Sequence, residues 1–271
     1  MKKILLLAYS LFFVSMQYAC AQKRVPAQQQ PRATAEVMKK NMQSPQWRKD
    51  NFIVDRDSAY VNPYYAVQKL MGGNKRFEQA RSIHPRQDPA LIMSLSEGQY
   101  PFATIVGCSD SRVSGEILFD QGFGDLFVAR TAGQVMAEAT YGTLEYAYLE
   151  LGTKLIVVLG HSGCGAVGAA IKRPENPPGH IVTLINSVKP AALEAEKMQG
   201  EKLENAVRQN VINQVKELRQ LESVLSRGFD RGDLLVVGAV YNLATGKVEF
   251  LEETMQNLPK TSYSKNNITG R

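Results

Sequence analysis

Two short segments of the 271-residue sequence combine side chains that bind metals. The first is "CSDSR", which carries Cys108, Asp110 and Arg112 at alternate positions. The second is "HSGC", which carries His161 and Cys164 three residues apart. Two thiolates and one imidazole form a ligand set of catalytic zinc sites, which leave a fourth position open. The competing interpretation is a disulfide between the two cysteines, with an unrelated histidine.

Both segments directly follow apolar runs. "ATIVG" precedes Cys108, and "LIVVLG" precedes His161. Such nearly continuous runs, rich in β-branched residues, are typical of strands buried on both faces of a sheet. In open α/β sheets, ligand sites form just beyond the carboxyl ends of the strands. A helix is predicted to begin at Cys164, and the positive end of its dipole favours a thiolate there.

Asp110 and Arg112 allow two interpretations. In the first they form a structural salt bridge in a loop. In the second, Arg112 holds the Asp110 carboxylate in a bidentate pair and keeps it off the metal. Asp110 then orients a water molecule by accepting its hydrogen bond. The remaining histidines, His84 and His180, lie in proline-rich loop sequence and are predicted to have surface roles.

The elements that position these residues form an α/β pattern. Strands are predicted at "FATIVG", "GDLFVA", "KLIVVLG" and "DLLVVGAVY", with a last strand after a turn at Gly246. Helices are predicted between them, at about residues 137–150, 164–172, 181–198 and 201–227. This alternation predicts a mostly parallel central sheet covered by helices on both faces. The turn at Gly246 predicts an antiparallel edge strand.

Two helices are predicted before the first strand. Asn62-Pro63 and Asp88-Pro89 both combine a capping residue with proline at the first helical position. The first of these helices is amphipathic, with Gly72-Gly73 as a candidate break. A further helix is expected at about residues 34–43, where it would form an N-terminal helical arm.

Residues 1–21 have the pattern of a signal peptide. Two lysines precede the apolar run "ILLLAYSLFFV", which is too short to span a bilayer. Ala19-Cys20-Ala21 is a small-x-small cleavage signature. Cys20 is alternatively a lipidated cysteine, which would attach the protein to a membrane. Both interpretations predict an exported, periplasmic protein.

The sequence predicts one domain with extensions. A flexible leader and helical arm are expected at residues 22–61, the domain at residues 62–258 and a tail at residues 259–271. The net charge is +6, and removing residues 1–21 would lower it to +4. Lysines and arginines form no block, so nucleic acid is not expected as a partner.

Two other catalytic motifs are excluded by spacing. A phosphatase loop needs arginine six positions after its cysteine, and that position holds Ser114. A hydrolase nucleophile elbow needs Gly-x-Ser-x-Gly, whereas "GHSGC" ends in cysteine.

"CSDSRV", followed about fifty positions later by "HSGCG", resembles the β-class carbonic anhydrases. The resemblance extends from about residue 62 to residue 251. It implies the β-carbonic anhydrase fold and one Zn²⁺ per chain, held by Cys108, His161 and Cys164. It also implies reversible hydration of CO2 to bicarbonate by zinc-bound hydroxide. Asp110 and Arg112 would orient that hydroxide and keep the fourth zinc position open.

The resemblance also implies substrate-binding residues. Gln99, nine residues before the first ligand, corresponds to the donor of a hydrogen bond to bicarbonate. Phe127 and Tyr146 correspond to apolar walls of the CO2 pocket, and Gly165 follows the last ligand as in the family. A homodimer or homotetramer is expected. The chain departs from the family's Arg-Asn-x-Ala-Asn pattern at residues 130–134, which read "RTAGQ".

Two alternatives to CO2 hydration stay open from the sequence. One is a non-catalytic scaffold of the same fold, with structural zinc or a redox-sensing cysteine pair. The other is a hydrolase acting on COS or CS2, because the same hydroxide could attack any linear heterocumulene.

Overall fold

The computed structural model of the protein describes residues 56–256 and residue 258, which fall in one compact unit. The predicted signal peptide, residues 22–55 of the predicted leader and arm, and the predicted tail lie outside the described residues. Within the described part, none of the helices combines the length and apolar character needed to cross a bilayer.

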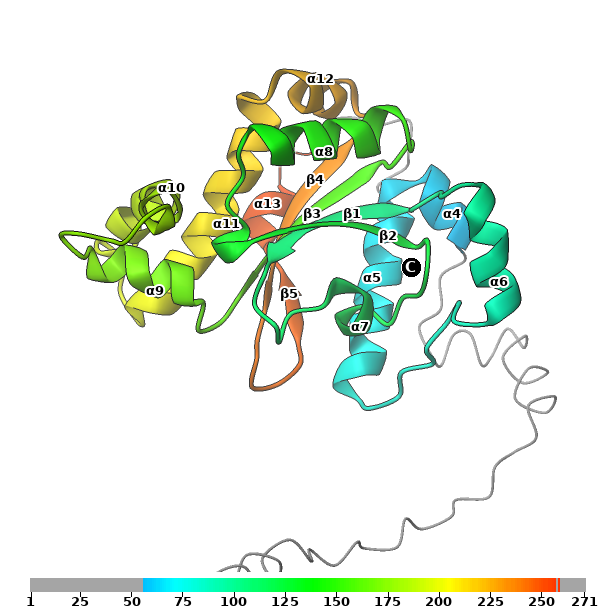
Figure 1. Ribbon diagram of the computed structural model, residues 1–271, viewed down its shortest axis with the longest axis horizontal. Coiled ribbons are helices and arrows are strands. Elements are labelled where there is room, and N and C mark those ends of the chain that lie inside the picture. Colours follow the sequence, from blue (N-terminus) through cyan, green and yellow to red (C-terminus); the bar gives the residue numbers. More distant parts are fainter. Residues whose placement is uncertain (1–55, 257, 259–271) are drawn as a thin grey trace, which may run out of the picture. The chain divides into compact units, whose positions relative to one another are not determined.

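The core of the protein is a five-stranded sheet (Figure 1). Its strands are β1 (Ala103–Cys108), β2 (Leu126–Thr131), β3 (Leu155–His161), β4 (Leu235–Tyr241) and β5 (Val248–Phe250). They lie in the order β2-β1-β3-β4-β5. The first four are parallel and β5 pairs antiparallel with β4, which confirms the predicted sheet and its antiparallel edge.

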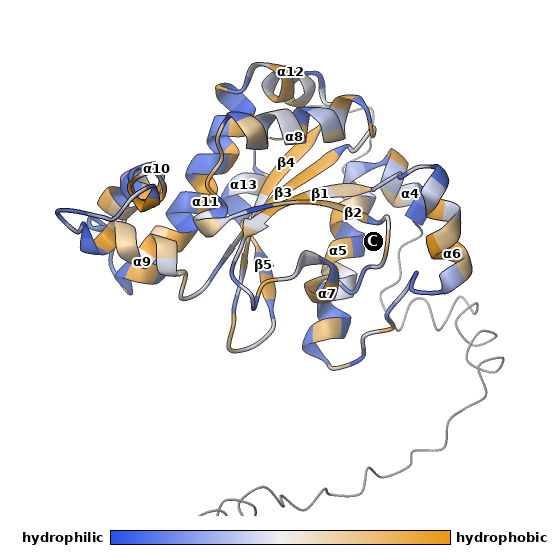
Figure 2. Cartoon of the chain, in the orientation of Figure 1, coloured by the Kyte–Doolittle hydropathy of each residue, from blue (hydrophilic) through white to orange (hydrophobic). Residues whose placement is uncertain are grey.

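The strands differ in burial according to their place in the sheet. β1 and β3 are buried at every position and β4 at all but one, and they are coloured as hydrophobic in Figure 2. β2 is only half-buried, so the prediction that it is buried on both faces is wrong. The reason is its edge position, because β1 is its one neighbour in the sheet among the residues that the structure describes.

Helices cover both faces of the sheet, as predicted. In chain order the helices are α4 (Arg56–Val61), α5 (Pro63–Glu78), α6 (Pro89–Ser94), η1 (Leu95–Glu97), α7 (Gly115–Leu118), η2 (Ala132–Gln134), α8 (Glu138–Leu149), α9 (Gly165–Lys172), α10 (Ile181–Ala195), α11 (Lys202–Gln220), α12 (Ser223–Arg231) and α13 (Glu252–Met255). Figure 1 shows α8 and α12 on one side of the sheet and α5 with α7 on the other.

The single helix predicted at about residues 201–227 is wrong, because the structure divides this segment into α11 and α12. The chain leaves the helical conformation at Glu222, which has a ψ of 116°. The Glu222 carboxylate then caps α12 by accepting hydrogen bonds from the backbone N–H groups of Val224 and Leu225. A side-chain acceptor at this position satisfies donors that a new helix leaves unpaired.

Helix α5 begins as predicted and continues past its candidate break. The Asn62 side chain accepts a hydrogen bond from the Tyr64 backbone N–H at 3.0 Å. Gly72 and Gly73 are both helical and buried, so a break there is wrong. Gly73 instead permits close packing, since a Cβ atom there would lie 1.7 Å from the Phe119 carbonyl oxygen. The glycine therefore lets α5 approach the backbone that follows α7.

Replacing Gly73 by alanine is expected to lower the free energy of unfolding by about 1–3 kcal/mol, because the methyl group overpacks the contact with Phe119. Gly142 in α8 is the matched control, as a Cβ atom there meets nothing within 4 Å. Alanine at Gly142 should instead stabilise the protein by up to about 1 kcal/mol through helix propensity. Urea unfolding of both variants measures the two changes. Equal effects would contradict the packing role of Gly73.

Helix α4 lies in the range predicted as an arm, and it packs onto the domain. Ala59 is fully buried in the main hydrophobic core. Arg56 forms an ion pair with the buried carboxylate of Asp125, at 3.1 Å between Nε and Oδ1. The described chain is therefore integrated into the core from α4 onward.

The strand order reverses direction at β1. The chain passes from β1 to β2 on one side and then returns to β3 on the other side of β1. The connections after β1 and β3 consequently diverge, which is the arrangement that forms ligand sites in α/β sheets. Because β1 and β3 are parallel and adjacent, their carboxyl ends reach the same edge of the sheet.

Candidate metal centre

Three potential metal ligands meet at this edge of the sheet. Cys108 is the last residue of β1, His161 is the last residue of β3, and Cys164 is the cap residue before α9. The two Sγ atoms and a ring nitrogen of His161 all lie within 4.8 Å of one another. All three residues are buried, and both cysteines are free thiols. The structure thus gathers the two sequence segments into one cluster.

The geometry of the cluster suits zinc. Zinc holds sulfur at about 2.3 Å and nitrogen at about 2.0–2.1 Å, so two ligands of one ion lie at most about 4.6 Å apart, and a shift of a few tenths of an ångström brings a cluster bounded at 4.8 Å into this range. His161 Nδ1 lies 3.0 Å from the Ser162 carbonyl oxygen and donates to it. His161 Nε2 is buried and has no hydrogen-bond partner. A metal-binding histidine has this arrangement, with one ring nitrogen anchored and the other directed to the ion.

Backbone donors surround the Cys108 sulfur. Its Sγ atom accepts hydrogen bonds from the N–H groups of Asp110, at 3.4 Å, and Gly133, at 3.3 Å. Interaction with the neighbouring Cys164 sulfur lowers the pKa of Cys108 and raises the pKa of Cys164. A bound cation would displace the proton of each thiol that it ligates.

The same cluster also shifts the pKa of His161. Burial acts to lower this pKa, but the interaction with the Cys108 sulfur and its charge outweighs burial and raises it. At Cys164, the backbone N–H groups of Val167 and Ala166 act in the direction expected at the start of a helix and lower the pKa. The interaction with the Cys108 sulfur, together with burial, outweighs these N–H groups, so the pKa of Cys164 is raised.

Asp110 and Arg112 form the bidentate pair of the second interpretation, in which Arg112 holds the Asp110 carboxylate. Arg112 Nε donates to Asp110 Oδ1 at 2.9 Å, and Arg112 Nη2 donates to Oδ2 at 2.7 Å. These hydrogen bonds hold the pKa of Asp110 well below its usual range. Asp110 Oδ2 lies 3.9 Å from His161 Nε2, so the carboxylate stands beside the ligand cluster.

Residues 130–134, where the sequence departs from the family pattern, support the same loop. Arg130 donates from Nε to the Cys108 carbonyl oxygen at 2.9 Å and from Nη2 to the Asp110 carbonyl oxygen at 2.7 Å. Gly133 has a φ of 67°, a left-handed conformation that favours glycine. The segment therefore holds the backbone on which both Cys108 and Asp110 lie.

The residues expected to bind substrate lie apart from the cluster, with one exception. Gly165 is next to Cys164, at the first position of α9. Gln99 precedes β1, whose length separates Ala103 from Cys108 by about 16 Å. Phe127 pairs with Thr104 in the sheet, about 13 Å along the strands from the level of Cys108.

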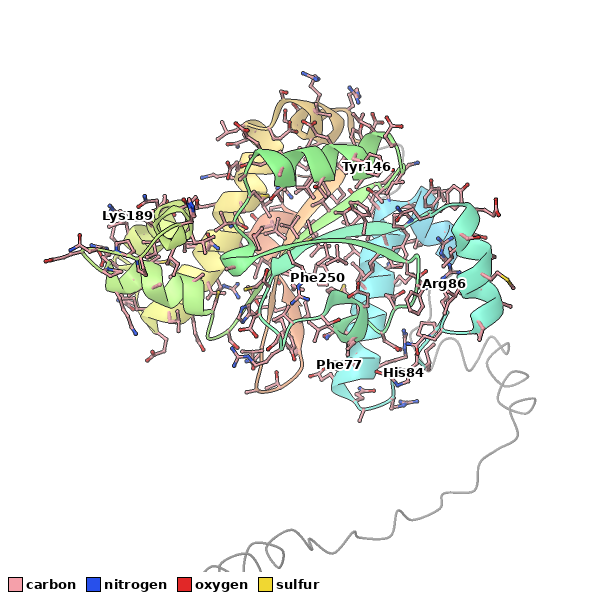
Figure 3. All side chains as sticks on the ribbon, in the orientation of Figure 1. Phe77, His84, Arg86, Tyr146, Lys189 and Phe250 are labelled. Atoms are coloured by element: carbon pink, nitrogen blue, oxygen red, sulfur yellow. The ribbon has the colours of Figure 1, made fainter. Side chains whose placement is uncertain are left out.

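Phe127 and Tyr146 nevertheless lie together. Their ring centroids are 6.2 Å apart, and Figure 3 shows Tyr146 on α8. The Tyr146 side chain is 48 % exposed. His84 and His180 are exposed, in keeping with the predicted surface roles. Within one chain, the aromatic pair therefore forms a surface feature separate from the metal ligands.

Sequence reasoning missed two residues behind the cluster. Asn210 and Gln214 of α11 are buried and donate hydrogen bonds to the Gly133 carbonyl oxygen. The sequence does indicate that both amides are buried, because they are spaced i, i+4 among the apolar positions of an amphipathic helix. Buried amides in such a face need partners, but the sequence does not indicate which partners.

The fold and the site together define an α/β protein with a Cys–His–Cys cluster able to bind a metal at the carboxyl ends of parallel strands. Residues 103–248 match the carbonic anhydrase family. The carbonic anhydrase of Mycolicibacterium smegmatis is 41 % identical over 191 residues, which cover 69 % of this chain and 93 % of that protein. Carbonic anhydrase 2 of Mycobacterium tuberculosis is 40 % identical over 190 residues, 69 % of this chain and 92 % of that protein.

Solved structures show which class of carbonic anhydrase this chain is similar to. The Coccomyxa β-carbonic anhydrase in complex with acetazolamide aligns with a TM-score of 0.56 and 28 % identity, over 67 % of this chain and 84 % of that chain. A tetrameric β-carbonic anhydrase of Sordaria macrospora aligns with a TM-score of 0.53 and 26 % identity, over 69 % and 95 %. The chain belongs to the β-carbonic anhydrase family.

Proposed function

We propose that this protein is a zinc enzyme that reversibly hydrates CO2 to bicarbonate and a proton. One observation carries the proposal: the buried Cys108–His161–Cys164 cluster stands beside a carboxylate that Arg112 holds by two hydrogen bonds. Zinc held by the three side chains supplies a Lewis acid that makes water acidic enough to act as a nucleophile near neutral pH. A structural zinc site would have no use for the adjacent Asp110–Arg112 pair.

The Asp110 carboxylate has two tasks in this proposal. It accepts a hydrogen bond from the attacking water and so orients the water oxygen toward CO2. It also stays bound to Arg112 instead of joining the ligand cluster, although its Oδ2 atom lies only 3.9 Å from His161 Nε2. Because its pKa is held low, the carboxylate remains an acceptor throughout the neutral range.

A hydration assay with metal analysis tests the proposal. The purified protein should contain about one zinc per chain and accelerate CO2 hydration in a stopped-flow pH-indicator assay. Protein loaded with zinc but inactive at alkaline pH would contradict the proposal and favour the non-catalytic scaffold. Zinc-loaded protein that hydrolyses COS or CS2 but not CO2 would instead favour the heterocumulene hydrolase.

We further propose that the protein is a homo-oligomer in which the surface around Phe127 and Tyr146 contributes to CO2 binding. In one chain this aromatic pair is about 13 Å along the sheet from the level of the metal ligands. A second copy could bring the pair to a neighbouring site. The exposed Tyr146 ring, packed on the half-buried Phe127, supports this proposal, because contact with another chain would remove it from water.

Replacing Tyr146 by serine is therefore expected to raise the KM for CO2 about tenfold while zinc content stays unchanged, since an apolar wall contributes about 1–2 kcal/mol. Leu221→Ser is the control, because Leu221 is 78 % exposed at the junction of α11 and α12. Steady-state kinetics measure the effect, and light scattering gives the oligomeric state. A monomer, or equal KM values in both variants, would contradict this role.

Export is a separate proposal that rests on residues 1–21. Intact mass and N-terminal analysis of protein from the periplasmic and membrane fractions would distinguish its two forms. Plain cleavage leaves Gln22 as the first residue, whereas lipidation leaves an acylated Cys20 in the membrane fraction. An uncleaved N-terminus on cytoplasmic protein would contradict export.

A further inference from the structure

Two buried amide side chains of α11 lie behind the metal centre. Asn210 is 2 % exposed and Gln214 is 6 % exposed, on the face of α11 that packs against the domain. They are remote in sequence from the segments that supply the metal ligands. Burying amides in an apolar helix face is unfavourable unless hydrogen bonds compensate, so their partners indicate what they support.

The partner of both amides is the Gly133 carbonyl group. Asn210 Nδ2 donates to the Gly133 oxygen at 3.1 Å. Gln214 Nε2 lies 3.5 Å from the same oxygen and 3.4 Å from Asn210 Oδ1, so it also holds the Asn210 amide in orientation. On its other side, Gly133 donates its N–H to Cys108 Sγ at 3.3 Å. The carbonyl group and the N–H of Gly133 belong to the two peptide planes that flank its Cα atom, so Gly133 connects α11 to a metal ligand through its own backbone torsions.

Gly133 needs this support because its backbone is free to rotate. Its φ of 67° and ψ of 20° are left-handed, and a Cβ atom there would lie 3.0 Å from the Ala166 Cβ atom. Only glycine suits the position, and glycine fixes its own conformation least of all residues. The hydrogen bond from Asn210 supplies the orientation that a side chain at position 133 cannot supply.

We propose that Asn210, oriented by Gln214, is a positioning residue of the metal centre. It holds the peptide plane between Gly133 and Gln134 and so restricts the backbone torsions of Gly133, which aim the Gly133 N–H at the Cys108 sulfur. That hydrogen bond sets the electron donation of the sulfur to the metal. This inference rests on the proposed function, because it takes Cys108 to be a metal ligand. Groups that orient ligands in this way typically change metal affinity or activity by about 10–100-fold when removed.

Cobalt substitution tests the inference without relying on activity. The sulfur-to-cobalt charge-transfer band of the Co²⁺-loaded protein reports on electron donation by the cysteines. Asn210→Leu replaces the amide by an apolar group of similar size. Asn210→Ser shortens the side chain so that it no longer reaches the Gly133 carbonyl oxygen, and it adds no apolar bulk there. Asn213→Leu is the matched control, because Asn213 lies on the same helix and bonds to Gln209 and Glu194 instead.

In both Asn210 variants, the charge-transfer band should move to longer wavelength, because a sulfur that loses an N–H donor gives up electrons more readily. Zinc affinity, measured by competition with a chromophoric chelator, should fall about tenfold, because the loss of a pre-positioned Cys108 sulfur outweighs its stronger electron donation. Asn213→Leu should match the wild type in both measurements. Circular dichroism identifies the folded variants, and Asn210→Ser is decisive if Asn210→Leu does not fold.

The outcomes separate this inference from the proposed function. Folded Asn210 variants with the wild-type band and zinc affinity would overturn the positioning role and leave the metal centre intact. An equal shift in Asn213→Leu would also overturn it, because the effect would then be general to α11. Wild-type protein that binds cobalt without sulfur charge transfer would overturn the metal assignment itself, and the inference with it.

Discussion

Replacing Cys164 by serine is expected to leave a folded protein that holds almost no zinc and hydrates CO2 at least about a thousandfold more slowly. Zinc lowers the barrier of such reactions by several kcal/mol, and about 4 kcal/mol corresponds to a thousandfold change in rate. The loss should be this large because, among the residues that the structure describes, Cys164 is one of three side chains clustered to hold the ion. Bound-metal analysis and stopped-flow hydration measure both effects.

The position of Cys164 makes this variant a clean test. Cys164 is the cap residue of α9, with a φ of −65° and a ψ of 120°, and its side chain makes no capping hydrogen bond. Serine is a preferred residue at that position, so helix α9 should not be weakened. Lys172→Ser, at the other end of the same helix, is the control and should keep zinc and activity. A Cys164→Ser protein with full zinc content would refute the proposed ligand set.

The second large effect is expected from Arg112→Ala, which should lower the hydration rate about a hundredfold while zinc content stays near one per chain. Without Arg112, the pKa of Asp110 should return toward its ordinary value of about 3.9. The carboxylate then remains charged at neutral pH and is no longer restrained. Since Asp110 Oδ2 already lies 3.9 Å from His161 Nε2, it can join the ligand cluster and take the position that substrate water needs.

Two further variants make the explanation specific. Arg112→Lys keeps the positive charge but loses the two parallel hydrogen bonds, so an intermediate rate is expected. Arg173→Ala removes an arginine whose Nη2 atom pairs with Glu196 at 2.6 Å on the protein surface, and it should have the wild-type rate. Hydration assays and metal analysis on all three variants test whether the Asp110–Arg112 pair keeps the fourth metal position open. A normal rate in Arg112→Ala would show that the pair does not control the open position.

The results for Cys164→Ser and Arg112→Ala together would separate residues that bind the metal from residues that keep the bound metal active. Cys164→Ser should lose zinc and activity together, whereas Arg112→Ala should lose activity alone. A protein that lost zinc in both variants would have a site in which Asp110 and Arg112 support the fold of the loop. The direct hydrogen bonds from Arg130 to the carbonyl oxygens of Cys108 and Asp110 argue against that outcome, because they hold the loop independently of Arg112.

The strands and the central site were predictable because their signals are local. Buried parallel strands are apolar along their whole length, so "ATIVG" and "LIVVLG" identify β1 and β3 without further information. The next residues, Cys108 and His161, must then lie at strand ends. Parallel strands end at one edge, which brings these side chains together whenever the two strands are neighbours.

Other predictions were wrong where a neighbour in space decided the outcome. The apolar run of β2 resembles that of a central strand, yet β2 is an edge strand and only half-buried. Gly72-Gly73 resembles a helix break, but Gly73 is the point where α5 touches the Phe119 backbone. The end of α11 depends on the Glu222 carboxylate turning back to cap α12.

The sequence by itself determined the chemical types at the site, the α/β class and the strand ends that carry Cys108 and His161, because these properties depend on residues adjacent in the chain. Only the tertiary structure decided that β1 and β3 are neighbours, that the Phe127–Tyr146 pair lies apart from the cluster, and that Asn210 supports Gly133. These contacts join residues far apart in the sequence. Their partners are selected by the packing of whole elements, which no local pattern of residues encodes.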